Sequence, residues 1–133
     1  LVLADLQLGL VREGHVVAPK AVELWLEQWN QDQALDRILI GDGTGSRAWI
    51  KRLERLGHLT VVPEQGTTLR ARQRYWTLWP ARGWRRMLPA GLRIPPVDLD
   101  AVAALVMLEE HLQCSLRWPE PAPTFSLRTW PEP

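Results

Sequence analysis

Seven arginines between Leu69 and Arg93 are the side chains of this sequence best suited to binding a ligand. The stretch contains no acidic residue, so its local charge is +7 in a chain whose net charge is +1. The planar guanidinium fork suits phosphate recognition, and interleaved aromatic rings can stack on bases. This composition favours a nucleic-acid surface, and the alternative is a solvated helix face followed by a packing loop. The arginines are Arg70, Arg72, Arg74, Arg82, Arg85, Arg86 and Arg93, and the aromatic residues are Tyr75, Trp76, Trp79 and Trp84.

Two carboxylates and a glycine-rich turn occupy positions where a sheet of parallel strands binds its ligands, beyond the carboxyl ends of the strands. Glu64 directly follows an apolar run, and Asp100 opens an apolar helical segment. The glycine-rich turn, Gly41–Gly45, follows another apolar run but lacks the Gly-Lys-Ser/Thr ending of a phosphate loop. The structural alternatives are a loop acid at Glu64, a helix-capping acid at Asp100 and a tight turn at the glycines.

The elements that would position these residues alternate along the chain. Hydrophobic periodicity predicts an α/β domain with a largely parallel sheet, whose opening strand pair is antiparallel because only a turn joins it. We expect an irregular loop over residues 81–96, which are rich in glycine and proline. The expected strands are 1–3, 10–17, 37–40 and 59–62, and the expected helices are 21–31, 46–56, 67–79 and 98–113, the last of them buried nearly all round.

The bulk properties set limits on this interpretation. A chain of 133 residues is long enough for one domain with one core, which we assign to residues 1–114. Residues 115–133 contain five prolines and are predicted to form a tail without a core. A single cysteine, Cys114, excludes an internal disulfide and fits a cytoplasmic protein, and no apolar run is long enough for a membrane span.

Several short motifs, in this order and spacing, resemble the YqgF/RuvX family of Holliday-junction resolvase-like proteins. Val61–Thr68, which reads Val-Val-Pro-Glu-Gln-Gly-Thr-Thr, is similar to the Val-Asp-Glu-Arg strand end of that family with its following Thr-Thr. Leu99–Ala104, with Glu109 beyond it, resembles the family's Val-Asp-x-x-Ala-Ala helix. Two further segments, Thr68–Trp76 and Leu88–Pro96, resemble the corresponding segments in the cyanobacterial branch of that family.

The resemblance covers residues 1–113 and implies a ribonuclease-H-like fold, a mixed sheet flanked by helices. It implies a nuclease that hydrolyses phosphodiesters in DNA junctions or ribosomal RNA precursors with Mg²⁺ or Mn²⁺. Glu64 and Asp100 would be catalytic metal ligands, Asp98 an outer-shell acid, and the seven arginines would hold phosphates. The family's first strand carries a further aspartate in an Asp-x-Gly motif. Because the sequence opens inside an apolar run at Leu1, we expect that strand to precede it.

Two positions depart from the family pattern, and other functions stay open. Gln65 stands where the family usually has arginine, and Pro63 where it usually has aspartate. A nucleic-acid-binding protein of the same fold without catalysis is therefore the second hypothesis. A small-molecule enzyme with a nucleotide in the Gly41–Gly45 loop is the third.

Overall fold

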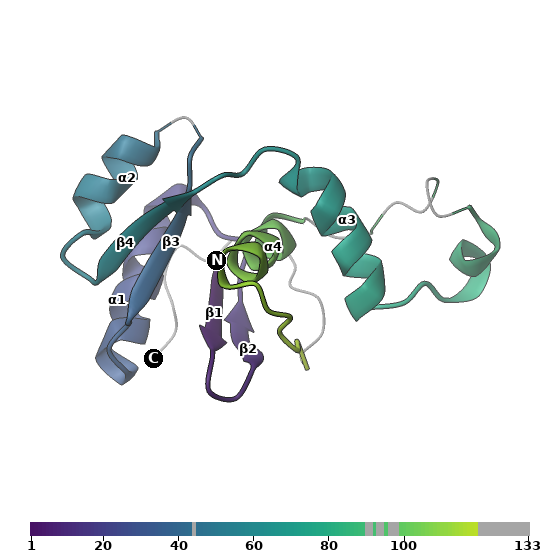
Figure 1. The fold of residues 1–133 in the computed structure, drawn as a ribbon, viewed down its shortest axis with the longest axis horizontal. Helices are drawn as coiled ribbons and strands as arrows, with labels where there is room; N and C mark the ends of the chain where they lie inside the picture. Colours follow the sequence, from purple (N-terminus) through teal and green to yellow (C-terminus); the bar gives the residue numbers. More distant parts are fainter. Residues whose placement is uncertain (44, 90–91, 93–94, 96–98, 120–133) are drawn as a thin grey trace. The chain divides into compact units, whose positions relative to one another are not determined.

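The computed structural model has α/β architecture and divides into two compact units, each of which is described by itself. The first unit comprises Leu1–Val16 and the described residues from Gln65 onward, and the second comprises Val17–Glu64 (Figure 1). The structure describes residues 1–43, 45–89, 92, 95 and 99–119.

The second unit is built on two parallel strands, β3 (Arg37–Gly41) and β4 (His58–Val62). They pair in register from Arg37 opposite His58 to Gly41 opposite Val62. A parallel pair needs a crossover rather than a tight turn, and helix α2 (Ser46–Leu53) supplies it. The chain enters this pair through a short 3-10 helix, η1 (Pro19–Ala21), and α1 (Val22–Asp32). The strands and helices predicted for this part of the chain are confirmed.

Helices α1 and α2 of the second unit are linked by ion pairs on their exposed sides. Trp29 of α1 is buried, as its place on the apolar stripe predicts. On the exposed side, Glu23 pairs with Arg52 and Arg55, and Arg55 also pairs with Glu27. Exposed pairs of this kind contribute at most about 1 kcal/mol each, so the buried apolar face dominates the packing.

The first unit combines an antiparallel hairpin with two longer helices. The hairpin consists of β1 (Val2–Asp5) and β2 (Leu10–Gly14). The helices are α3 (Thr67–Leu78) and α4 (Asp100–Leu112), and a 3-10 helix, η2 (Gly83–Met87), lies between them in sequence. Both predicted kinds of strand pairing are confirmed, but the described strands form two separate two-stranded sheets instead of the single sheet expected.

Helix α4 is buried on two sides, which explains why its sequence is apolar nearly all round. One side packs with β2 and the segment after α4, and the other side packs with α3. The first cluster is Val11, Val16, Ala101, Leu105, Leu116 and Trp118, and the second is Ala71, Tyr75, Val102 and Val106.

The segment that follows α4 belongs to the core. Leu116 and Trp118 are buried, and Arg117 forms a parallel bridge with Leu10. The Val11 amide donates a 2.7 Å hydrogen bond to the Arg117 carbonyl. The predicted tail without a core is therefore wrong for residues 115–119, because alternate apolar side chains turn inward while the backbone pairs with β2. Residues 120–133 lie outside the described residues.

Candidate functional site

Glu64 stands at the carboxyl end of β4, where its carboxylate lies against the glycine-rich turn after β3. A Cβ atom added at Gly43 would lie 2.9 Å from Glu64 Cδ, and one added at Gly41 would lie 3.2 Å from the same atom. Both glycines therefore leave the space that the carboxylate fills. Glu64 is nevertheless exposed, so its oxygens can reach a ligand in solvent.

Asp42 is a second carboxylate at this edge of the parallel pair. Its Oδ1 accepts a 3.2 Å hydrogen bond from the Glu64 amide, and its own amide donates to the Val62 carbonyl at 3.0 Å. From the sequence, this turn was a candidate phosphate loop, and Asp42 was not predicted as a site residue. The signal was present, because Asp42 follows β3 as Glu64 follows β4, and parallel pairing in register brings two such positions together.

Asp100 begins α4 in the first unit and is exposed. Asp98, the third acid of the predicted site, lies outside the described residues. Glu64 and Asp100 belong to different units, so the structure describes the surroundings of each one separately.

A metal centre held by protein side chains alone is not found in the part of the chain that the structure describes. No group of three or more Asp, Glu, His or Cys side chains gathers there. Magnesium usually keeps several waters and binds one or two carboxylates together with substrate phosphates. Asp42 and Glu64 offer that smaller number of protein ligands.

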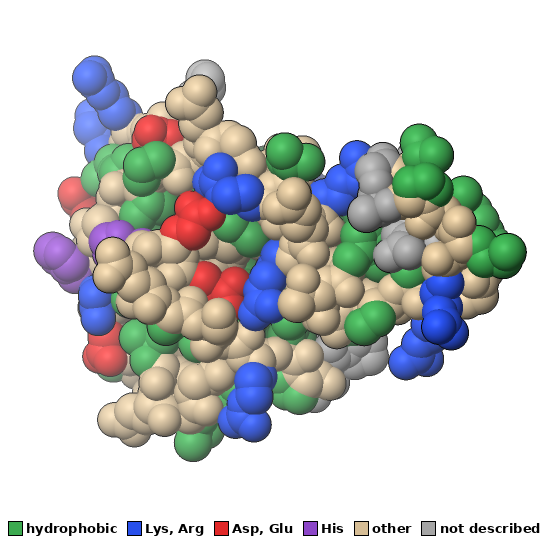
Figure 2. Space-filling view, turned by 45° about the vertical axis from the view of Figure 1, so that its right-hand side comes forward, with side chains coloured by type: hydrophobic (Ala, Val, Ile, Leu, Met, Phe, Trp, Pro, Cys, Tyr) green, Lys and Arg blue, Asp and Glu red, His purple; other side chains and the backbone are tan. Residues whose placement is uncertain are grey.

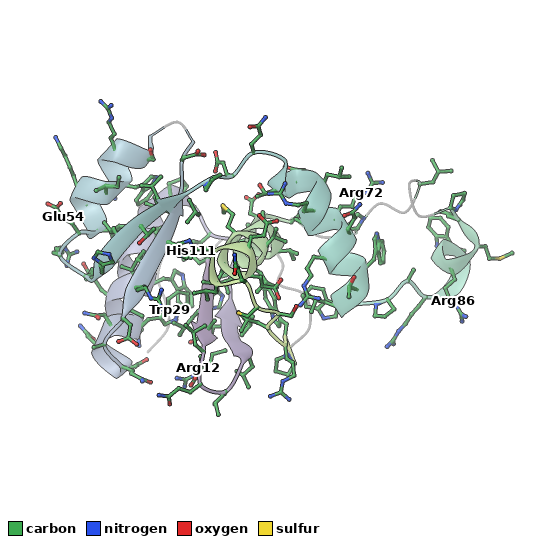
Figure 3. The ribbon with its side chains drawn as sticks, in the orientation of Figure 1. Arg12, Trp29, Glu54, Arg72, Arg86 and His111 are labelled. Atoms are coloured by element: carbon green, nitrogen blue, oxygen red, sulfur yellow. The ribbon has the colours of Figure 1, made fainter. Side chains whose placement is uncertain are left out.

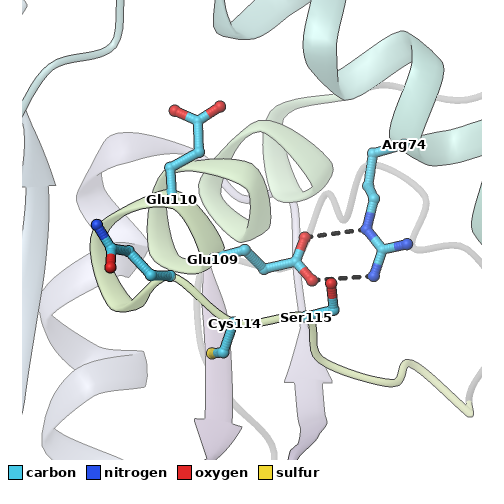
Figure 4. A pocket seen from close by; sticks show the side chains of 6 residues that line it. Arg74, Glu109, Glu110, Cys114 and Ser115 are labelled. Atoms are coloured by element: carbon cyan, nitrogen blue, oxygen red, sulfur yellow. Dashed lines mark hydrogen bonds and ion pairs between the residues drawn. The ribbon is translucent and has the colours of Figure 1, made fainter.

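Two of the predicted phosphate-binding arginines are held by carboxylates of α4. Arg74 Nε and Nη2 donate to the two oxygens of Glu109, both at 2.9 Å (Figure 4). Arg70 pairs with Glu110 in the same two-point manner. Arg70 and Arg74 lie one helical turn apart on α3, so they face the adjacent acids of α4 as a matched set. These pairs neutralise part of the local charge of +7.

The arginines near η2 have different surroundings. Arg82 and Arg86 are exposed, whereas Arg72 is half-buried. Figure 3 labels Arg72, which belongs to α3, and Arg86, which belongs to η2. The side chain of Arg85 and the whole of Arg93 lie outside what the structure describes.

Large apolar side chains share the η2 segment with these arginines. The exposed fraction is 65% for Trp84 and 88% for Met87. Basic and hydrophobic side chains accordingly lie close together at the right of the space-filling view (Figure 2). Trp84 is one of the interleaved aromatic residues that the sequence singles out.

No protein-family model matches the chain, and neither the curated proteins nor the solved structures contain a match. Among the described residues, every helix is too short or too polar to cross a bilayer.

Proposed function

We propose that this protein is a metal-dependent endonuclease that hydrolyses phosphodiesters in structured nucleic acid, with Glu64 as a metal-binding carboxylate. The observation that carries the proposal is the position of Glu64. Its exposed carboxylate is held over Gly41 and Gly43 at the carboxyl end of a parallel strand pair, beside Asp42. In α/β sheets this edge is where ligands bind.

The two carboxylates would supply the negative charge that holds a divalent metal ion for phosphodiester hydrolysis. A bound Mg²⁺ or Mn²⁺ would activate the attacking water and neutralise charge on the leaving oxygen. Glu64 would bind that ion directly. Asp42 orients the Glu64 backbone through its 3.2 Å hydrogen bond, and its carboxylate brings a second negative charge to the same edge.

The finer parts of the proposal come from the sequence resemblance. They are a ribonuclease-H-like fold, a second metal ligand at Asp100, an outer-shell role for Asp98, and a DNA junction or ribosomal RNA precursor as substrate. The α/β architecture and the exposure of Asp100 at the start of α4 are compatible with these expectations.

Charge-removing substitutions in the complete protein test the proposal. Glu64→Gln and Asp100→Asn should each abolish Mg²⁺-dependent cleavage of a labelled four-way DNA junction and of a structured RNA, because each keeps size but removes a ligand charge. Glu54→Gln, at another exposed acid of the second unit, is the matched control and should cut at the parent rate. Thermal melts confirm that each variant folds. A Glu64→Gln protein that cuts as fast as the parent would refute the site assignment.

The second candidate function is nucleic-acid binding without cleavage. It is favoured by the η2 segment, whose exposed arginines and Trp84 would bind nucleic acid without any metal. Gln65 also favours this function, because the family that the sequence resembles usually has arginine at this position. Salt-dependent binding in EDTA, with no product after prolonged incubation in Mg²⁺ or Mn²⁺, would identify this function.

A further inference from the structure

The arginine-rich stretch of the first unit contains two sets of arginines with different surroundings. On α3, Arg70 and Arg74 each bind a carboxylate of α4 through two nitrogen atoms. At η2, Arg82 and Arg86 are exposed, and residues 69–93 contain no acid. The α3 set therefore holds two helices together, whereas the η2 set presents positive charge to solvent.

An exposed indole lies between the two η2 arginines in sequence. Trp84 is two residues from Arg82 and two from Arg86, and 65% of its surface is exposed. Met87, at 88% exposure, extends the apolar surface. An exposed apolar surface beside exposed cationic side chains is suited to a partner with flat apolar faces on an anionic backbone. Unpaired nucleic acid combines these two properties.

We propose that η2 and its flanking arginines bind an unpaired strand of nucleic acid, with a base stacked on Trp84 and adjacent phosphates on Arg82 and Arg86. A base within a duplex is already stacked on both faces, so an aromatic side chain reads single strands, loops and ends. The proposal rests on the nucleic-acid role proposed above and is independent of cleavage. It names the substrate feature that the protein recognises, which is a single-stranded region within or next to structured nucleic acid.

Binding measured without cleavage tests the proposal. We would titrate the chain, in EDTA, into a labelled oligothymidylate and into a blunt duplex of equal length, and follow fluorescence anisotropy. Trp84→Ala should weaken single-strand binding by about 5- to 150-fold and change duplex binding much less. Trp84→Phe should retain part of the affinity because it keeps an aromatic face. Leu69→Ala, at an exposed apolar residue of α3, is the matched control and should bind like the parent.

The arginines are tested through the salt dependence of the same titration. The double variant Arg82→Gln and Arg86→Gln should flatten the slope of log Kobs against log salt by about 0.7 for each lost phosphate contact on a single strand. Arg12→Gln, at an exposed arginine of β2, should leave the slope unchanged. An unchanged slope in the double variant would overturn the assigned role of these arginines.

The outcomes separate this inference from the proposed nuclease activity. Parent-like single-strand binding by Trp84→Ala, or an equal loss on duplex, overturns the stacking role whatever the cleavage data show. Loss of single-strand affinity in Trp84→Ala supports the inference even if Glu64→Gln still cuts, a result that would refute only the metal site. The inference is also overturned if the parent chain does not bind oligothymidylate but binds anionic vesicles, or if it self-associates in a way that Met87→Ala abolishes. Either result would assign η2 to another partner.

Discussion

Replacing Glu109 by alanine should destabilise the first unit far more than the same change at its neighbour Glu110. Both acids lie near the end of α4, and both bind an arginine of α3 through two nitrogen atoms. Their surroundings differ. The side chains of Glu109 and Arg74 are 11% and 21% exposed, whereas those of Glu110 and Arg70 are 48% and 40% exposed.

Glu109 also holds the segment that follows its own helix. Its Oε2 accepts a 2.7 Å hydrogen bond from the Leu116 amide, while Arg74 Nη2 donates to the Leu116 carbonyl at 3.0 Å. Removal of Glu109 therefore leaves the Leu116 amide without its acceptor, and among the described residues Arg74 keeps only the Leu116 carbonyl as a partner for its partly buried guanidinium. Hydrogen bonds to charged groups contribute about 1.5–3 kcal/mol each. Because water can still reach Arg74, we expect a total loss of about 2–3 kcal/mol.

The matched change at Glu110 should cost at most about 1 kcal/mol, because an exposed ion pair gains little over hydration. Alanine has the higher helix propensity at both positions, so that contribution cancels in the comparison. Added salt should screen the Arg70–Glu110 pair and leave the Arg74–Glu109 pair almost unchanged. Mutation of the two adjacent acids therefore isolates the effect of burial.

Urea unfolding followed by far-UV circular dichroism would give the two free energies of unfolding, provided that the m values stay equal. Amide hydrogen exchange gives a local measurement as well, because exchange of the Leu116 amide should accelerate in the Glu109 variant and not in the Glu110 variant. Equal losses for the two variants, or a loss below about 1 kcal/mol for Glu109→Ala, would refute the reasoning.

Two further predictions concern the core of the first unit and the helix pair of the second. Gly14→Ala should lower the free energy of unfolding by about 1–3 kcal/mol, because the new Cβ would lie 2.5 Å from Trp118 Cη2. The double variant with Trp118→Leu should lose less stability than the two single variants combined. Additive losses in denaturation experiments would contradict this. The hydrogen bond from Arg52 holds the pKa of the Glu23 carboxyl below its ordinary value of 4.5. The stabilisation that this ion pair gives the folded state is therefore complete above pH 4.5 and is lost as the pH falls through the lowered pKa. Arg52→Gln should flatten stability against pH below about 4.5, and unchanged acid-limb curves in urea titrations would contradict the assignment.

The secondary structure of this chain could be predicted closely from its sequence. The apolar stripe at Val22, Trp25, Leu26 and Trp29 predicts α1, and the short apolar runs ending at glycine or proline predict β3 and β4. These signals are local, because the burial of one face imposes a period on neighbouring residues. The coarse α/β class follows from the order of the elements.

The arrangement of the site residues depended on contacts that sequence spacing does not encode. Arg74 and Glu109 are 35 residues apart, and in sequence the arginine looks like one more phosphate ligand. Asp42 follows β3 as Glu64 follows β4, but it is the strand register that places the two residues side by side. Leu116 lies in a segment whose proline content predicts a tail, and its burial depends on pairing of that segment with β2. In each case the deciding partner is remote in sequence.

Val17–Glu64 lies in the sequence between the two segments of the first unit, and this insertion has a consequence for the order of folding. That stretch is continuous and has its own strand pair, whereas the first unit needs residues from both sides of it. The pairing of Leu10 with Arg117 closes a span of more than a hundred residues. The entropy lost in such a closure grows with the length of flexible chain, and non-local pairing slows folding. If the inserted stretch becomes compact first, it shortens the flexible part of that span. We therefore expect the second unit to act as a kinetic aid to the first, with the Leu10–Arg117 bridge forming late.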